Sequence, residues 1–178
     1  MHPILTTPRL ALYELQANDL DFVAGMLADP EVTRYYARRF SRADAEVWLN
    51  RQIERYERDG HGLWLVRERA TGTPVGQVGL AIQEVAGMRR PELGWLLAQE
   101  FWGRGYATEA GAATRSAAFE RWAYSEVISL IRPENEPSRR VAGRLGMVAA
   151  EEVEFHGFRH IVYQSSSCTT AAPGGGSS

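Results

Sequence analysis

Apolar residues recur along the chain with two periods, which predict its strands and helices. Leu93, Trp95 and Leu97 alternate with other residues, as in a strand, whereas the apolar residues between 41 and 60 repeat every three to four positions, as in a helix. Strands are expected over residues 9–15, 63–68, 75–83, 90–98, 126–132, 147–154 and 158–164. Helices are expected between residues 18 and 29, 41 and 60, 106 and 122, and 135 and 146. The pattern alone predicts an α/β or α+β domain built on one sheet.

Capping residues support the helix boundaries. Ser41-Arg-Ala-Asp44 resembles a capping box, and Gly60 suits the end of the same helix. Asn135-Glu-Pro137 suits another helix start, because proline is tolerated in the first turn. The helix that begins near residue 106 carries a face of small residues that allows close packing on a sheet: Ala107, Ala110, Ala113 and Ala117.

Composition and charge narrow the class of protein. We expect residues 1–164 to form one domain and residues 165–178, rich in Ser, Thr and Gly, to form a disordered tail. Twenty basic and 22 acidic residues give a net charge of −2, which argues against recruitment by nucleic acid or an anionic membrane. The chain has no apolar run of membrane-spanning length and no secretory signal pattern, and its one cysteine, Cys168, cannot form an internal disulfide. We therefore expect a cytoplasmic protein, either a monomer or a homodimer.

A glycine-rich turn joins an expected strand to an expected helix at residues 102–110. Gly103 and Gly105 flank Arg104, and the helix follows at once. The amides of a helix's first turn lack helical partners, and the helix dipole is positive there, so such a turn suits an anion. Glycine lets the backbone approach a phosphate closely. The segment matches neither a Walker loop nor a full dinucleotide fingerprint, and a lone Gly-x-Gly by itself favours a tight strand-to-helix connection by a wide margin.

The motif at residues 102–110, Trp-Gly-Arg-Gly-Tyr-Ala-Thr-Glu-Ala, resembles the acyl-CoA pyrophosphate loop of the GNAT N-acetyltransferases. It is most similar to the branch that acetylates the N-terminal alanine or serine of ribosomal proteins. Three other segments, residues 7–12, 74–80 and 135–147, resemble motifs of that branch in the same order. The resemblance spans about residues 7–163.

The resemblance implies the GNAT fold, a mixed, mostly antiparallel, twisted sheet of about seven strands with helices on both faces. It also implies acetyl-CoA, bound in a V-shaped split between the fourth and fifth strands. In this family a bulge in the fourth strand frees backbone groups, which bind the pantetheine arm like an added strand.

The resemblance assigns three groups of coenzyme-binding residues. The backbone of residues 95–97 would hold the pantetheine arm and polarise the thioester carbonyl, and residues 103–108 would seat the pyrophosphate. Trp102 departs from the Gln or Arg usual in the wider superfamily. Asn135 and Ser138 would lie near the pantetheine, although both are also favoured at helix starts. The complete expected set is Trp95, Leu96, Leu97, Trp102, Gly103, Arg104, Gly105, Tyr106, Ala107, Thr108, Asn135, Ser138 and Arg144.

The implied reaction is direct attack of a primary amine on the thioester within a ternary complex. The amine must first lose a proton, because an α-amine has a pKa of about 8 and a lysine of about 10.4. Glu92 is the expected general base, acting through water, although a solvated glutamate at a strand end is an equal alternative. The departing thiolate needs a proton, and no tyrosine lies between Glu134 and Val162. Ser138, Tyr163 or water must therefore supply it.

The sequence does not identify the acceptor amine. A protein N-terminal α-amine is the first expectation, with a small amine such as a polyamine, amino acid or aminoglycoside as the alternative. A different class is a CoA-binding sensor or scaffold that has lost catalysis. Tyr35, Tyr36 and Phe40 are candidates to line the acceptor side, and no metal site is expected, since His156 and His160 have no ligand-spacing partner.

Overall fold

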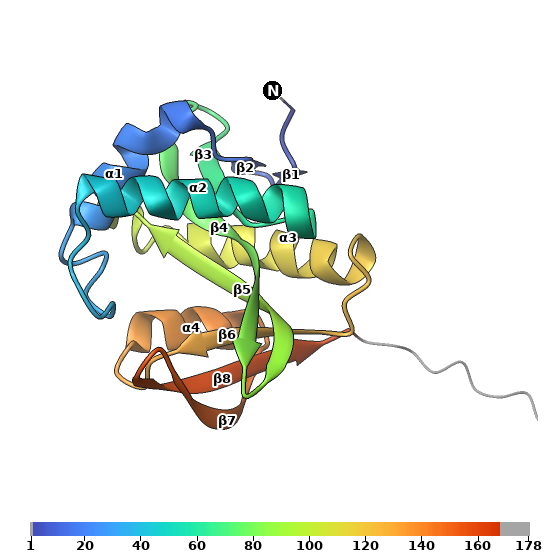
Figure 1. Cartoon of the computed structure of the whole chain (residues 1–178). Coiled ribbons are helices and arrows are strands. Elements are labelled where there is room, and N and C mark those ends of the chain that lie inside the picture. Colours follow the sequence, from blue (N-terminus) through green and yellow to red (C-terminus); the bar gives the residue numbers. More distant parts are fainter. Residues whose placement is uncertain (1, 168–178) are drawn as a thin grey trace, which may run out of the picture.

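The computed structural model describes residues 2–167 as one eight-stranded sheet with helices on both faces (Figure 1). Neighbouring strands follow the order β1-β2-β3-β4-β5-β6-β8-β7. The strands are β1 (Leu5–Thr6), β2 (Leu10–Tyr13), β3 (Leu63–Glu68), β4 (Pro74–Val85), β5 (Met88–Leu97), β6 (Glu126–Ile131), β7 (Val148–Phe155) and β8 (Phe158–Ser166). The helices are α1 (Leu20–Ala28), α2 (Arg42–Asp59), α3 (Tyr106–Glu120) and α4 (Glu136–Arg144), with short 3-10 turns η1 (Ala17–Asp19) and η2 (Gln99–Phe101). The predicted mixed, mostly antiparallel fold is confirmed.

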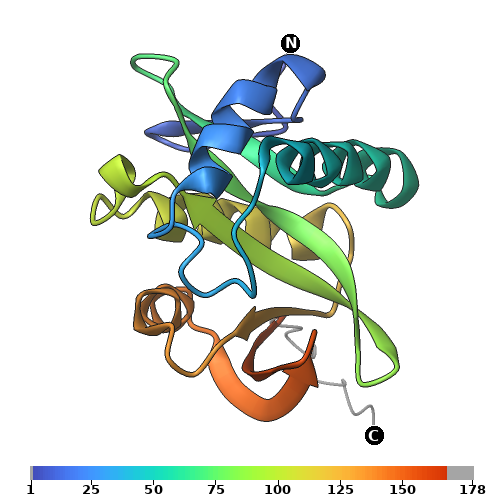
Figure 2. The same ribbon diagram turned by 60° about the vertical axis from the view of Figure 1, so that its left-hand side comes forward.

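Helices cover the sheet on opposite sides, and each side has its own apolar core (Figures 1 and 2). Helices α1 and α2 pack on one face through Leu15, Val23, Leu27, Ala45, Leu49 and Leu65. Helix α3 packs on the other face, where Ala110 and Ala118 are fully buried in the larger core. A Cβ at Gly111 would lie 3.0 Å from the Leu145 side chain, so this small residue lets α3 approach the segment that ends α4. Of the expected small-residue face, Ala107 and Ala113 are only half-buried.

The split expected between the fourth and fifth predicted strands lies between β5 and β6. These two strands run parallel and share the single registered pair Glu92–Ile128 within the described residues. Just beyond it, the Ser129 hydroxyl donates to the Leu93 carbonyl at 2.6 Å, a side-chain bridge where the backbone ladder has ended. In the part of the chain that the structure describes, the outer edge of β5 after Leu93 therefore has no strand neighbour, which positions it for an extended ligand.

The expected bulge in this strand is wrong. The β4–β5 ladder runs from the pair Gly76–Leu97 to the pair Val85–Met88 with no register shift. A bulge is unnecessary here, because the divergence of β6 alone leaves the outer edge of β5 unpaired.

Several predicted boundaries shift. The two-residue β1 was missed, which makes the strand count eight and not seven. Strand β5 begins at Met88, so Glu92 lies inside the strand and not at its start. Strand β8 continues to Ser166 by pairing with the start of β6, so the tail prediction is wrong for residues 165 and 166. The rest of the predicted tail from residue 168 on, including Cys168, lies outside the described residues. No helix in the described part of the chain is long and apolar enough to cross a membrane.

Candidate active site

The turn between β5 and α3 exposes a row of unpaired backbone amides. Gly103 and Gly105 have φ of +76° and +80°, the left-handed region that favours glycine, and Gly105 is the N-cap of α3. Within residues 2–167, no amide of residues 103–108 donates to a protein acceptor; the first bond of the helix is from the Glu109 amide to the Gly105 carbonyl. The Thr108 hydroxyl is also buried without a partner. The predicted site for a phosphate at this turn therefore fits the structure.

Side chains of this loop are engaged with the protein. The Trp102 indole donates to the Leu97 carbonyl at 2.8 Å. The Tyr106 hydroxyl donates to Glu68 at 2.6 Å, and Arg104 lies 3.6 Å from the same carboxylate. The backbone amides are thus the unpaired groups of the loop, and the roles of the Trp102, Arg104 and Tyr106 side chains in coenzyme binding stay predictions.

The start of α4 meets β5 across the split. The Trp95 indole donates to the Ser138 hydroxyl at 3.2 Å, and the Asn135 side chain accepts from the Ser138 amide at 3.2 Å. Asn135 is thus the N-cap of α4, the structural role that its sequence position also favours. Three expected coenzyme residues from β5 and α4 come together here. Arg144 ends α4 as an exposed residue, and its role stays a prediction.

Tyr163 also connects to α4. It is buried on β8, and its hydroxyl accepts a hydrogen bond from Arg139 Nε at 3.2 Å. Arg139 follows Ser138 in the chain, so the two expected proton donors are linked to adjacent residues of one helix. Both hydroxyls accept a bond from a neighbour, which leaves each hydroxyl hydrogen available for donation.

Glu92 lies where β5 and β6 part. Its carboxylate accepts a hydrogen bond from Gln83 at 2.7 Å, and the side chain is only partly exposed. Burial raises the pKa of the Glu92 carboxyl, against the lowering effects of hydrogen bonds from Gln83 and the Leu130 amide and of the Arg55 charge. Glu92 thus lies within β5 and not at a strand end, and its role as general base stays a prediction. A partly buried carboxylate with a raised pKa is the chemistry expected of a general base.

An aromatic cluster lies on the α1 and α2 side of the sheet. Tyr36, Phe40 and Trp48 meet edge to face, with ring centroids 5.5 to 6.1 Å apart. The Trp48 indole donates to Gln77 Oε1 at 2.9 Å. Tyr36 is 38% exposed, so this cluster reaches the protein surface. We call Tyr36, Phe40 and Trp48 the aromatic wall.

Sequence reasoning missed Trp48 and Gln77 as site neighbours. Trp48 reads as an ordinary residue on the inner face of a helix. Gln77 is fully buried, and its Nε2 has no partner among the described residues. The signal that could have identified Gln77 is an isolated glutamine within the apolar run of β4, because a buried polar group needs a partner. No cluster of three or more metal-ligating side chains occurs in residues 2–167.

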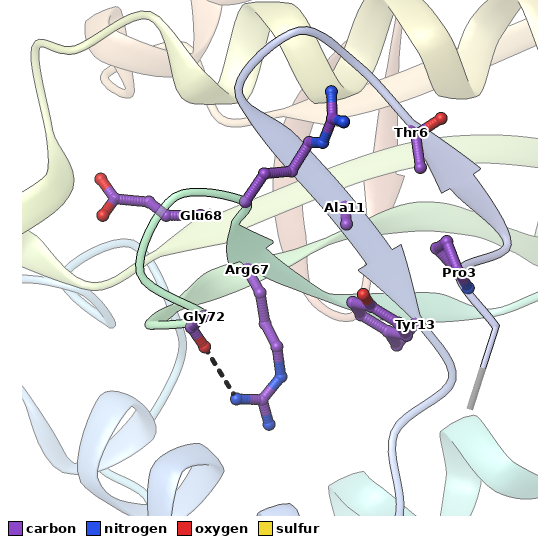
Figure 3. Close-up of a pocket in the computed structure, with 8 residues that line it drawn as sticks. Pro3, Thr6, Ala11, Tyr13, Arg67, Glu68 and Gly72 are labelled. Carbon is purple, nitrogen blue, oxygen red and sulfur yellow. Dashed lines mark hydrogen bonds between the residues drawn. The ribbon is translucent and has the colours of Figure 1, made fainter.

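A separate surface pocket of about 310 Å³ lies on the outer strands (Figure 3). Its lining is Pro3, Thr6, Ala11, Tyr13, Arg67, Glu68, Arg69 and Gly72. Arg67 donates to the Gly72 carbonyl at 3.0 Å, and Arg69 donates to the Thr7 carbonyl at 2.9 Å. The pocket contains none of the expected site residues, and its arginines are bound to the protein.

The split sheet and the glycine turn at the start of α3 together define an acyltransferase fold. The family description "Acetyltransferase (GNAT) domain" matches residues 9–148, and the chain belongs to this GNAT family. It is an acyl-CoA-dependent N-acetyltransferase. The family binds acetyl-CoA and acts on amines.

Relatives and solved structures agree with this assignment. The chain is 31% identical to the uncharacterized protein YkkB of Bacillus subtilis over 144 residues, which are 80% of this chain and 84% of that protein. It is 26% identical to the uncharacterized N-acetyltransferase YoaA of the same organism over 149 residues, 82% and 83% of the two chains. An acetyltransferase structure from Agrobacterium tumefaciens has a TM-score of 0.82 and 27% identity, covering 94% of this chain and 96% of its own.

A ribosomal-protein acetyltransferase is also among the structural neighbours. The structure of RimL, a ribosomal L7/L12 alpha-N-protein acetyltransferase in complex with coenzyme A, has a TM-score of 0.76 and 15% identity, covering 93% of this chain and 98% of its own. At this identity the likeness shows the fold alone. The narrower resemblance to the ribosomal-protein branch stays a prediction.

Proposed function

We propose that this chain transfers the acetyl group of acetyl-CoA to the N-terminal α-amine of a protein by direct attack in a ternary complex. The observation that carries the coenzyme part is the row of six backbone amides at residues 103–108, none of which has a protein acceptor in the described part of the chain. These amides would bind the diphosphate at the positive end of the α3 dipole. The unpaired edge of β5, residues 95–97, would bind the pantetheine arm.

Different residues of the chain would carry out the successive steps of the acetyl transfer. Glu92 accepts the amine proton through water, and the freed nitrogen forms a C–N bond with the acetyl carbon. A backbone amide of Leu96 or Leu97 stabilises the oxyanion that forms. The C–S bond then breaks, and the thiolate takes a proton from Ser138, Tyr163 or water. The nitrogen gives up its second proton, which restores that donor and leaves the amide and the free thiol. No covalent enzyme intermediate is needed.

The acceptor assignment rests on the resemblance of residues 102–110 to the branch that acetylates protein N-termini. Burial raises the pKa of the Glu92 carboxyl, which makes it a stronger base than an ordinary glutamate toward any amine. An α-amine with a pKa of about 8 is easier to deprotonate near neutral pH than a lysine at about 10.4, which also favours the α-amine. Trp48 of the aromatic wall bonds Gln77, whose side chain lies on the same face of the β4–β5 pair as Glu92, so the wall would contact the residues that follow the amine.

A thiol-release assay with acetyl-CoA and an amine panel tests the assignment. The panel contains peptides with a free alanine or serine N-terminus, the same peptides with a blocked N-terminus and an internal lysine, and the small amines spermidine, an amino acid and an aminoglycoside. We expect turnover with the free N-termini and little with the blocked peptides. Turnover confined to small amines would show that the acceptor is a small molecule and not a protein N-terminus. Coenzyme A binding without thiol release from any amine would indicate a sensor or scaffold.

Replacing Tyr36 tests the aromatic wall. We expect Tyr36→Ala to raise the acceptor KM about threefold to tenfold, because one aromatic contact is worth roughly 0.5–1.5 kcal/mol. The KM for acetyl-CoA should stay unchanged. Val47→Ala is the matched control, since Val47 is 58% exposed beside Trp48. An equal effect of both substitutions on acceptor KM, or a change in acetyl-CoA KM alone, would remove Tyr36 from the acceptor side.

Replacing the two hydroxyl donors tests the final proton transfer. We expect Ser138→Ala to lower kcat about 100-fold, the lower end of general acid contributions. Tyr163→Phe should lower it less, because Tyr163 is tied to Arg139 and not to the Trp95 indole beside the split. Pre-steady-state thiol release at several pH values measures both. Wild-type kcat in both variants would assign the proton to water.

A further inference from the structure

Arg9, between β1 and β2, binds the loop that follows β5. Its backbone amide and its Nε donate to the two carboxylate oxygens of Glu109 at 3.0 and 2.6 Å, and Nη2 lies 2.6 Å from Oε2. The Thr7 hydroxyl donates to the same carboxylate at 2.6 Å. Arg9 Nη1 donates to the Arg104 carbonyl at 3.0 Å. We call Thr7, Arg9 and Glu109 the Arg9 clamp.

The clamp contacts the loop at consecutive residues. The Arg9 guanidinium lies over the Tyr106 ring, 4.7 Å from its centroid. A Cβ at Gly105 would lie 3.5 Å from Arg9 Nη2. One side chain from the first strand pair therefore touches residues 104, 105 and 106.

These contacts fix the direction of an amide. A trans peptide is planar, and its C=O and N–H groups point in opposite directions. The Arg104 carbonyl belongs to the same peptide as the Gly105 amide. Because Arg9 holds that carbonyl, the Gly105 N–H must point away from Arg9. Two glycines in the left-handed region have no side chain to hold this orientation themselves.

The clamp also neutralises the negative charge of the Glu109 carboxylate. Glu109 lies in the first turn of α3, where a carboxylate favours the helix but would repel a bound diphosphate. Burial alone would raise the pKa of Glu109, but hydrogen bonds from Thr7 and Arg9 outweigh it and lower the pKa. Glu109 is therefore ionised near neutral pH, and the Arg9 guanidinium neutralises it.

We propose that the Arg9 clamp is a positioning device for the coenzyme, which presets the Gly105 amide and neutralises Glu109 beside the diphosphate. This inference rests on the proposed seating of the diphosphate at residues 103–108. Arg9 acts through the loop and through Glu109, so it is a positioning residue and not a catalytic one. It should govern coenzyme affinity and leave the chemical step nearly unchanged.

Calorimetric titration of coenzyme A into single and double variants tests the clamp. We expect Arg9→Met to weaken the Kd at least tenfold, with kcat at saturating acetyl-CoA within about threefold of wild type. The Kd of Arg9→Lys should lie between those of the wild type and Arg9→Met. A lysine neutralises Glu109 but cannot also hold the Arg104 carbonyl in the same geometry. Arg9→Met combined with Glu109→Gln should bind more tightly than Arg9→Met alone, because the uncompensated charge is gone.

The matched control is Arg67→Met. Arg67 is also paired with a carboxylate, Asp19 at 3.1 Å, and also donates to a backbone carbonyl, that of Gly72, but it does not touch the loop. Thermal unfolding of each variant identifies loss of the fold, and Arg9→Lys serves if Arg9→Met does not fold.

Two outcomes separate failure of the clamp from failure of the proposed function. Wild-type affinity in the Arg9 variants, with binding still lost in Gly105→Val, would overturn the clamp and leave the coenzyme site standing. Wild-type affinity in the Arg9 variants and in Gly105→Val would overturn both. A double variant that binds no better than Arg9→Met would overturn the neutralisation of Glu109.

Discussion

Gly105→Val is expected to weaken coenzyme A binding at least 100-fold. Gly105 has φ of +80°, and a β-branched residue is strained there by about 1–3 kcal/mol. The backbone can relieve that strain only by rotating, which turns the amides of residues 103–106 away from the diphosphate. The Cβ itself would only reach van der Waals contact with Arg9, 3.5 Å from its Nη2, so the backbone conformation is the main cause of the expected loss. Isothermal titration with coenzyme A measures the loss.

Gly157→Val is the matched control for this substitution. Gly157 has φ of +78° in the β7–β8 turn, and no other group lies within 4 Å of its Cβ position. Both variants should lose similar stability in thermal unfolding, but only Gly105→Val should lose the coenzyme. Equal affinity in the two variants would show that the turn before α3 does not seat the diphosphate.

Glu92→Gln is expected to lower kcat about 100-fold or more, because general base catalysis contributes on that scale. The carboxyl must be ionised to accept a proton, so wild-type turnover should rise with pH through the pKa of Glu92. Burial raises that pKa, so the rise should lie above the ordinary glutamate value of about 4.3. In Glu92→Gln this limb should vanish, and the loss should be greatest between the pKa of Glu92 and that of the amine. At higher pH the amine is already deprotonated, and the two enzymes should converge.

Glu84→Gln controls for the loss of a nearby charge. Glu84 is exposed on the adjacent strand β4, one residue from Gln83. Its replacement should leave both kcat and the pH–rate profile unchanged. A wild-type acid limb in Glu92→Gln would assign the base to another group.

The strands, the helices and the glycine turn before α3 could be predicted from the sequence because their signals are local. Alternation in residues 93–97, two glycines and an adjacent small-residue helix predict the strand, the turn and α3 within one continuous segment. The Ser41 capping box and the left-handed Gly60 at the end of α2 are confirmed for the same reason. The two-residue β1 is too short to give a periodic signal, so it was missed.

The contacts that complete the site are long-range, and periodicity does not encode them. Arg9 and Glu109 are 100 residues apart and Trp48 and Gln77 are 29 apart, yet each pair is hydrogen-bonded. The environment of Glu92 depends on its exact position in β5 and on the divergence of β6. The predicted strand began at residue 90, two residues after the observed start at Met88, so the prediction placed Glu92 near a strand end. The resemblance to a family supplied the order of the strands, which the pattern alone left undecided.

A crystal structure of the chain with bound acetyl-CoA would show whether residues 103–108 seat the diphosphate. We predict diphosphate oxygens about 3 Å from several amide nitrogens of residues 103–108, with the pantetheine arm along β5 in the split from β6. A diphosphate bound elsewhere, with those six amides facing solvent, would contradict this prediction.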